Sequence, residues 1–157
     1  MSQDARIRYF AYGSNLDTVQ MGRRCPGARI TSTATITGYR LAFTGESPGW
    51  GGAIATLVPE RGDAVQGLLW SLPVITLPAL DSYEGHPSLY RRVRRDVIDE
   101  FGERARAHVY IRALEGGERP AGAPYLEVLI RAYKRFQLDR SALDRALERA
   151  TSDGLRA

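Results

Sequence analysis

The chain has 157 residues, with 22 basic and 18 acidic side chains and a formal net charge of +4. This length fits one domain, so we expect residues 1–157 to form a single domain with roughly two-thirds of the unfolded surface buried. A hydrophobic content of 43% and a charged content of 25% are typical of a soluble globular protein. They exclude a disordered chain, a collagen-like fibre and a disulfide-stapled miniprotein.

Further features concern the compartment. The single cysteine, Cys25, cannot form an intrachain disulfide, which allows a reducing compartment. No apolar run approaches the roughly 20 residues that a membrane helix needs. Residues 1–6 lack the apolar segment of a secretory signal. We therefore expect a cytoplasmic protein without a membrane partner. The mild positive charge does not by itself indicate a nucleic-acid partner.

The first third of the chain predicts a strand, a helix and a long strand. Residues 6–12 are rich in aromatic and β-branched side chains, as strands are. Residues 15–24 have helical spacing, and Ser14 with Asp17 three positions on resembles a capping box. Residues 30–43 alternate loosely, which predicts one strand or two strands separated by a bend.

The middle of the chain predicts two hairpins. Residues 53–58 and 64–70 read as strands, and a turn over residues 61–63 would pair them. Residues 89–98 and 104–113 form the second predicted hairpin.

Three further helices are predicted. Thr76 can cap a short helix over residues 77–84, and Gly85 suits the left-handed position that ends it. Residues 125–136 and 141–150 are amphipathic. This order lacks the βαβ alternation of a doubly wound fold. We therefore expect an α+β protein whose mostly antiparallel sheet curls toward a barrel.

The segment Tyr12–Leu16 joins a predicted strand to a predicted helix. Consecutive backbone N–H groups and the positive end of the helix dipole can hold an anion there. Gly13 would let a ligand approach the backbone closely. The same residues also fit a tight turn capped by Ser14, and the sequence leaves both interpretations open.

Glu84 lies near the end of the short predicted helix. The negative end of the helix dipole disfavours an ionised carboxyl, and burial would raise its pKa toward neutrality. Such a group can serve as a general acid and base. A solvated glutamate at a helix end is the simpler alternative.

The sequence gives little indication of a metal site, a reactive cysteine or an RNA-binding surface. The two histidines, His86 and His108, do not form a cluster with metal-ligand spacing. Cys25 is expected to be a packing residue. The segment Arg91–Arg95 could contact RNA phosphates, but alternation on a strand splits its arginines between two faces, which favours a solvated edge or an interface.

Several motifs in order resemble the γ-glutamyl cyclotransferase family, which includes the AIG2-like and BtrG-like proteins. The resemblance spans about residues 7–140. The matching segments are Phe10–Leu16, Trp50–Thr56, Val65–Trp70, Leu80–Gly85 followed by Tyr90, and Pro124–Leu126.

The resemblance implies a small mixed, mostly antiparallel β-barrel flanked by helices. It also implies a cofactor-independent enzyme without a metal, of the acyltransferase or lyase type. In that family's reaction, the α-amine of a γ-glutamyl group attacks its own γ-carbonyl, which releases 5-oxoproline and a free amine or amino acid. Holding a curled substrate is the main requirement, because closure of a five-membered ring has a high effective molarity.

By resemblance, Glu84 is the catalytic general acid and base. The implied substrate-binding residues are Tyr12, Gly13, Ser14, Asn15, Leu16, Tyr90 and Tyr125. Asn15 stands where the glutathione-directed branch has leucine, which makes glutathione a less favoured substrate. The implied partner is a small-molecule γ-glutamyl amide, and a homodimer is the default expectation for such a chain. A non-catalytic binding module on the same fold and an RNA-associated protein are the alternatives.

Overall fold

The computed structural model describes residues 5–156, with side chains through Thr151. Residues 1–4, on which part of the expectation about a secretory signal rests, lie outside this range. The chain forms two compact units. The first comprises the N-terminal segment through Ile36 together with Gln66–Arg112, and the second comprises Thr37–Val65 together with the chain from Ala113 onward. The assignment of one domain to residues 1–157 stays a prediction.

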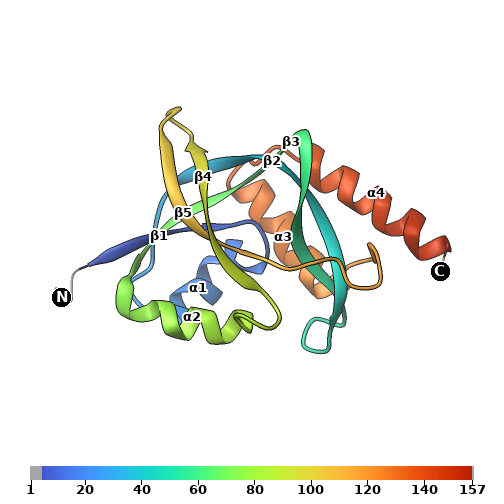
Figure 1. Cartoon of the computed structure of the whole chain (residues 1–157), viewed down its shortest axis with the longest axis horizontal. Coiled ribbons are helices and arrows are strands. Elements are labelled where there is room, and N and C mark those ends of the chain that lie inside the picture. The colour runs from blue at the N-terminus through green and yellow to red at the C-terminus, as the bar shows by residue number, and fades with distance from the viewer. Residues whose placement is uncertain (1–4, 157) are drawn as a thin grey trace. The chain divides into compact units, whose positions relative to one another are not determined.

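The strands form a closed barrel in the order β1-β3-β2-β4-β5 (Figure 1). Strand β1 is antiparallel to β3, strand β4 is antiparallel to both β2 and β5, and β1 is parallel to β5. The predicted mixed, mostly antiparallel barrel is therefore confirmed. The strands are β1 (Arg6–Ala11), β2 (Arg29–Ser47), β3 (Gly52–Pro73), β4 (Arg91–Asp99) and β5 (Arg104–Ile111).

Helices α1 and α2 belong to the first unit, where they contact each other, and α3 and α4 belong to the second unit. Within residues 5–156, no helix has the length and apolar character needed to cross a membrane. The helices are α1 (Thr18–Arg24), α2 (Leu77–Glu84), α3 (Ala123–Arg135) and α4 (Ser141–Arg156), and the short 3₁₀ turns are η1 (Ser14–Leu16) and η2 (Val74–Thr76).

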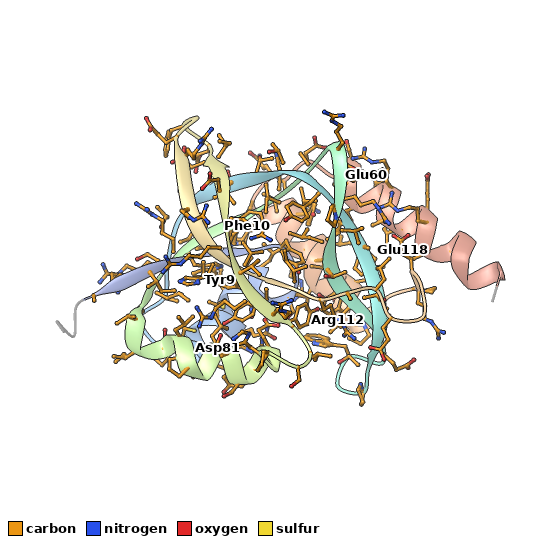
Figure 2. The ribbon with its side chains drawn as sticks, in the orientation of Figure 1. Tyr9, Phe10, Glu60, Asp81, Arg112 and Glu118 are labelled. Carbon is orange, nitrogen blue, oxygen red and sulfur yellow. The ribbon has the colours of Figure 1, made fainter. Side chains whose placement is uncertain are left out.

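Strand β1 pairs with both β3 and β5. Its neighbouring residues Tyr9 and Phe10 (Figure 2) point to opposite faces, as alternation on a strand requires, and both are buried. On β3, Gly67 lies so close to Ala11 that a Cβ atom would come within 2.1 Å of the Ala11 carbonyl oxygen. Glycine at this position therefore lets the two backbones meet.

Two local predictions are wrong. The predicted turn over residues 61–63 lies inside the continuous strand β3, so the first hairpin does not form. Its polar residues mark an exposed stretch of the strand and do not reverse the chain. Helix α1 begins at Thr18 and not at Asn15, because Asp17 is its N-cap and accepts a hydrogen bond from the Val19 N–H.

The second predicted hairpin is confirmed by the antiparallel pairing of β4 with β5. Gly85 ends α2 in the left-handed conformation, with φ of 69°. Thr76 occupies the N-cap position, but its hydroxyl donates to the Pro73 carbonyl and does not cap the helix. The long strand alternative for residues 30–43 is the one that forms, as β2.

Candidate active site

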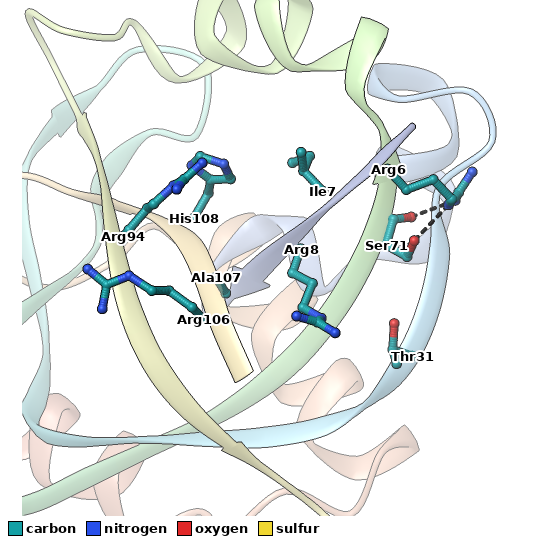
Figure 3. A pocket seen from close by; sticks show the side chains of 9 residues that line it. All are labelled: Arg6, Ile7, Arg8, Thr31, Ser71, Arg94, Arg106, Ala107 and His108. Carbon is teal, nitrogen blue, oxygen red and sulfur yellow. Dashed lines mark hydrogen bonds between the residues drawn. The ribbon is translucent and has the colours of Figure 1, made fainter. Parts of the chain in front are cut away.

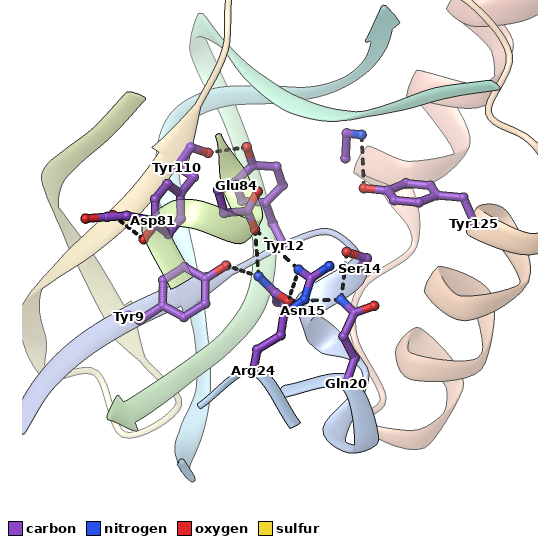
Figure 4. Close-up of polar contacts among 11 residues, drawn as sticks. Tyr9, Tyr12, Ser14, Asn15, Gln20, Arg24, Asp81, Glu84, Tyr110 and Tyr125 are labelled. Carbon is purple, nitrogen blue, oxygen red and sulfur yellow. Dashed lines mark hydrogen bonds and ion pairs between the residues drawn. The ribbon is translucent and has the colours of Figure 1, made fainter. Parts of the chain in front are cut away.

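Asn15 lies at the centre of a hydrogen-bond network in the first unit (Figure 4). Its Nδ2 donates to the Tyr9 hydroxyl at 2.9 Å and to Glu84 Oε1 at 2.8 Å. Its Oδ1 accepts from Gln20 Nε2 and from Arg24 NH1, both at 3.0 Å. All four bonding positions of this 2% exposed amide are therefore used, and its plane is fixed.

Glu84 is the last residue of α2, and its side chain is 15% exposed. Burial raises the pKa of this carboxyl above its ordinary value of 4.5. The Arg24 guanidinium, 3.9 Å from Glu84 Oε1, and the Asn15 hydrogen bond oppose that rise in pKa. A partly exposed carboxyl with a raised pKa can exchange protons with a bound molecule.

Tyr9 is buried beside this carboxyl. Burial and the charge of Glu84 raise the pKa of the Tyr9 phenol well above its ordinary value, so the phenol stays neutral. A neutral phenol adds no negative charge next to Glu84. The Tyr9 ring also packs edge to face against Tyr110, with ring centroids 5.6 Å apart.

Asp81 ties helix α2 to the barrel. Its Oδ1 accepts from the Tyr110 hydroxyl at 2.7 Å and from Arg92 Nε at 2.8 Å. Arg92 lies on β4 and Tyr110 on β5, so one carboxylate holds α2 to two strands. Asp81 and Glu84 are three residues apart in a helix and share a face. Asp81 therefore fixes the face of α2 that presents Glu84.

The turn between β1 and α1 uses part of its own hydrogen-bonding capacity. The Leu16 N–H donates to the Gly13 carbonyl at 2.9 Å, and the Asp17 N–H donates to the Ser14 carbonyl at 3.0 Å. The Ser14 hydroxyl accepts from Gln20 Nε2 at 3.0 Å. The N–H groups of Leu16 and Asp17 are therefore engaged within the turn.

The predicted tyrosines have different surroundings. Tyr12 donates its hydroxyl to the carbonyl of Tyr110, which joins the end of β1 to β5. Tyr90 is buried in the first unit, with the Arg112 guanidinium over its ring. Tyr125 lies in the second unit, where its hydroxyl accepts from the Ala55 N–H at 3.0 Å.

The first unit thus brings together Glu84 and the segment Tyr12–Leu16, which are distant in sequence. Sequence reasoning missed Tyr9, Gln20, Arg24, Asp81 and Tyr110. Asp81 had a usable signal, because it stands three residues before Glu84 in a helical segment. The other partners are set by tertiary contacts alone.

No cluster of three or more His, Cys, Asp or Glu residues that could hold a metal ion occurs in the described part of the chain. His86 Nδ1 accepts a hydrogen bond from the Arg92 backbone N–H at 3.0 Å, so this histidine has a structural partner. Cys25 is fully buried, and burial raises the pKa of its thiol. A buried thiol with a raised pKa is a packing group.

Solved structures share this fold. A structure named "Gamma-glutamyl cyclotransferase" aligns with a TM-score of 0.82 and 27% sequence identity, over 90% of this chain and 86% of that chain. The barrel with its helices is therefore a γ-glutamyl cyclotransferase-like fold.

The sequence comparison gives the family. The family model described as "Gamma-glutamyl cyclotransferase, AIG2-like" matches residues 9–127, so the chain belongs to this family. The human protein named "Gamma-glutamylcyclotransferase" is 35% identical over 109 residues, which is 66% of this chain and 57% of the human one. The protein of the same name from Bos taurus is 35% identical over 115 residues, which is 69% of this chain and 61% of the bovine one. The matched segment thus spans less than two-thirds of these relatives.

Proposed function

We propose that this protein is a γ-glutamyl cyclotransferase that converts a γ-glutamyl amide into 5-oxoproline and a free amine or amino acid. The observation that carries the proposal is the contact of Glu84 Oε1 with Asn15 Nδ2 at 2.8 Å, at the turn between β1 and α1. A carboxyl with a raised pKa, in contact with a residue of this turn in a member of this family, supports the proposal.

The reaction needs neither water nor a redox partner. The substrate's α-nitrogen forms a bond to its own γ-carbonyl carbon, and the bond from that carbon to the leaving nitrogen breaks. Two protons move from the α-ammonium group to the leaving nitrogen, which departs as an ammonium ion. The enzyme therefore has to hold the chain folded back and to carry protons over a short distance.

Glu84 is the proposed proton carrier. As a carboxylate it takes a proton from the α-ammonium and so frees the attacking lone pair. As a carboxylic acid it returns the proton to the leaving nitrogen. A raised pKa suits both halves of this cycle, because the group then changes charge at a small energetic cost.

The turn residues hold the substrate in this proposal. The N–H groups of Gly13, Ser14 and Asn15 are the donors for the γ-carbonyl oxygen, which becomes an oxyanion as the ring closes. The Asn15 side chain is occupied by four neighbours, so its part is to orient Glu84. Leu16 contributes a buried apolar side chain beneath the turn.

The remaining tyrosines orient the substrate in the proposed enzyme. Tyr12, at the start of the turn, is held by the Tyr110 carbonyl and fixes where the turn begins. Tyr90, in the same unit as Glu84, is assigned a contact with the glutamyl moiety through its hydroxyl, and the role of Tyr125 stays a prediction from the resemblance. These assignments use no cofactor and do not specify which amine leaves.

The test is direct incubation with substrates. Purified protein is mixed with a panel of γ-glutamyl amides whose leaving groups are amino acids, polyamine-type amines and larger amines, and 5-oxoproline is measured by mass spectrometry. We expect turnover of at least one compound and a loss of about 10²-fold or more in Glu84→Gln, as is typical when a general acid–base group is removed.

A matched control is Glu127→Gln on α3, where the carboxylate is exposed and pairs with Arg131 four residues on. This variant should retain full turnover. Activity that survives Glu84→Gln would contradict the role of Glu84. Tight binding without turnover across the panel would contradict the enzyme and favour a binding module.

A further inference from the structure

A cavity of about 580 Å³ lies in the first unit and is lined by residues from all five strands of the barrel. Its polar lining includes Arg6 and Arg8 from β1, Ser71 from β3, Arg94 from β4, and Arg106 and His108 from β5 (Figure 3). Glu84, Asn15 and the other residues of the candidate active site are not among its lining residues. Its volume is within the range of small-molecule sites, about 300–1,000 Å³.

The cavity coincides with a feature of the sheet topology. Strands β1 and β5 are parallel neighbours, and their pairing is given by the single register pair Tyr9 and His108. By contrast, β4 and β5 pair along their whole length. The cavity lies at this short parallel pairing, with lining residues from both β1 and β5.

The charges that line this cavity have one sign. It is lined by four arginines, and no acidic residue of the described chain lines it. Arg106 pairs with Asp96 at 3.4 Å, which partly offsets its charge. Arg8 and Arg94 form no ion pair with any residue within the range 5–156.

Two of the lining groups are held in place. Arg6 donates from Nε to Ser71 Oγ at 2.7 Å, and from NH2 to the carbonyls of Ser71 and Gly27 at 2.8 and 2.7 Å. His108 is 7% exposed and contacts Arg92 NH1 through Nδ1 at 3.1 Å. Its pKa is lowered by burial and by the charges of Arg92 and Arg94, so the imidazole is neutral and can offer a hydrogen bond.

The Arg91–Arg95 segment does not form the continuous basic strip that an RNA strand would need. Arg92 turns to Asp81, and Arg95 NH1 donates to the Arg94 carbonyl. Arg94 alone of these five residues lines the cavity. A cavity lined by several arginines favours a compact ligand with high charge density over an extended polymer.

We propose that this cavity is a binding site for a small molecule that carries two or more linked phosphate groups. Arg8 and Arg94 bind the phosphate oxygens, and Arg6 and Arg106 add positive charge to the lining. Ser71, on β3, holds the Arg6 side chain by two hydrogen bonds. Guanidinium groups match phosphate oxygens in pairs, which makes arginine well suited to this ligand class. The site is independent of the proposed cyclotransferase chemistry.

The test is calorimetric titration of the full chain with inorganic tripolyphosphate at fixed ionic strength. Sulfate, a single tetrahedral anion, is titrated for comparison. We expect tripolyphosphate to bind more tightly than sulfate. We also expect its binding to weaken when the titration is repeated at higher salt concentration. The double variant Arg8→Gln/Arg94→Gln should weaken binding at least about tenfold, because it removes two charge-assisted contacts. Each single variant should produce a part of that loss.

Arg61→Gln, which removes an exposed arginine on β3 in the second unit, is the matched control and should leave the affinity unchanged. Equal losses in Arg61→Gln and in the double variant would overturn the proposal, since binding would then follow net charge. Binding of a single-stranded RNA oligomer in place of tripolyphosphate would overturn it as well. Circular dichroism and thermal unfolding of each variant establish that all of them are folded.

Discussion

Asn15 Nδ2 lies 2.8 Å from Glu84 Oε1, although the two residues are 69 positions apart in the chain. Asn15 lies in the turn between β1 and α1, and Glu84 ends α2, so their contact fixes the distance between the turn and the carboxyl. Arg24 bonds to the same asparagine and lies 3.9 Å from the same carboxyl. The protonation of Glu84 is therefore set by a small number of neighbours that can be changed one at a time.

Arg24→Gln should shift the pH dependence of the proposed reaction. Arg24 holds the pKa of Glu84 down, while burial raises it above 4.5. If ionised Glu84 accepts the proton, kcat/KM in the wild-type protein rises with pH through a midpoint above 4.5. Removing the cation should move that midpoint upward by about one pH unit. The pH profile of kcat/KM checks this shift.

Arg23→Gln is the control for this shift, because Arg23 is the exposed neighbour of Arg24 on α1. Its acidic midpoint should match that of the wild-type protein. A midpoint that stays unchanged in Arg24→Gln, or that moves to lower pH, would contradict the electrostatic account of Glu84.

Glu84→Gln should change how stability depends on pH. A carboxyl whose pKa is raised by folding binds its proton more tightly in the native state than in the unfolded state. The native state therefore loses stability as pH rises from about 4.5 through the folded pKa. The glutamine variant lacks this loss, so its melting temperature relative to the wild-type protein should increase over that window. Thermal unfolding at pH 4 to 8 measures the difference, and a constant difference would contradict it.

Asn15→Ala should destabilise the first unit. The change removes the amide donor of the Tyr9 hydroxyl and of Glu84, and it removes one acceptor each from Gln20 and Arg24. Buried groups that lose a partner cost about 1–3 kcal/mol each, and relaxation toward water reduces the sum. Urea unfolding should therefore show a loss of about 2–4 kcal/mol. Gln20→Ala removes one of these donors and should cost less, and equal stabilities in both variants and the wild type would refute the network.

Asp81→Ala should loosen α2 and displace Glu84. The carboxylate accepts from Tyr110 and Arg92, which lie on separate strands. Hydrogen bonds to charged groups contribute about 1.5–3 kcal/mol, and partial exposure of this pair lowers that figure. Hydrogen exchange should show faster exchange for the α2 amides, and kcat of the proposed reaction should fall more than KM rises.

The control for Asp81 is Asp144→Ala on α4. Asp144 pairs with Arg140, and both side chains are about half exposed. Exposed pairs of this kind contribute little to stability, so α2 exchange should stay unchanged. Slow exchange of α2 in Asp81→Ala would show that the helix is held by its other contacts.

Local signals in the sequence predicted much of the fold because they act over a few residues. Gly85 ends α2 in the left-handed conformation that glycine adopts without strain, and the β4–β5 hairpin follows from two strand-like segments with a turn between them. The turn at residues 61–63 failed for a related reason: an exposed bend within a long strand has the same polar and glycine-rich composition as a reversal.

The residues of the candidate site could be predicted less completely from the sequence than the fold. Glu84 was singled out by its motif, and Gly13 and Asn15 by the turn that they form. Tyr110 and Arg24 carry no local signal, because their partners are chosen by tertiary packing of β5 and α1 against α2. Prediction of such partners requires the register of the strands, and a shift of one residue would turn Tyr110 to the other face.

Gly67→Ala tests the close approach of β3 to β1. A Cβ atom at this position would lie 2.1 Å from the Ala11 carbonyl oxygen and 2.9 Å from Phe10 Cζ. Because the nearest atom belongs to the backbone, the strands must separate, and we expect a loss of about 3 kcal/mol in urea unfolding. Gly22→Ala on α1 is the matched control, since a Cβ there meets no atom within 4 Å. Alanine in a helix interior should raise stability by about 0.5–1 kcal/mol. Equal effects of the two substitutions would contradict the contact between β3 and β1 that keeps the turn after β1 in place beside Glu84.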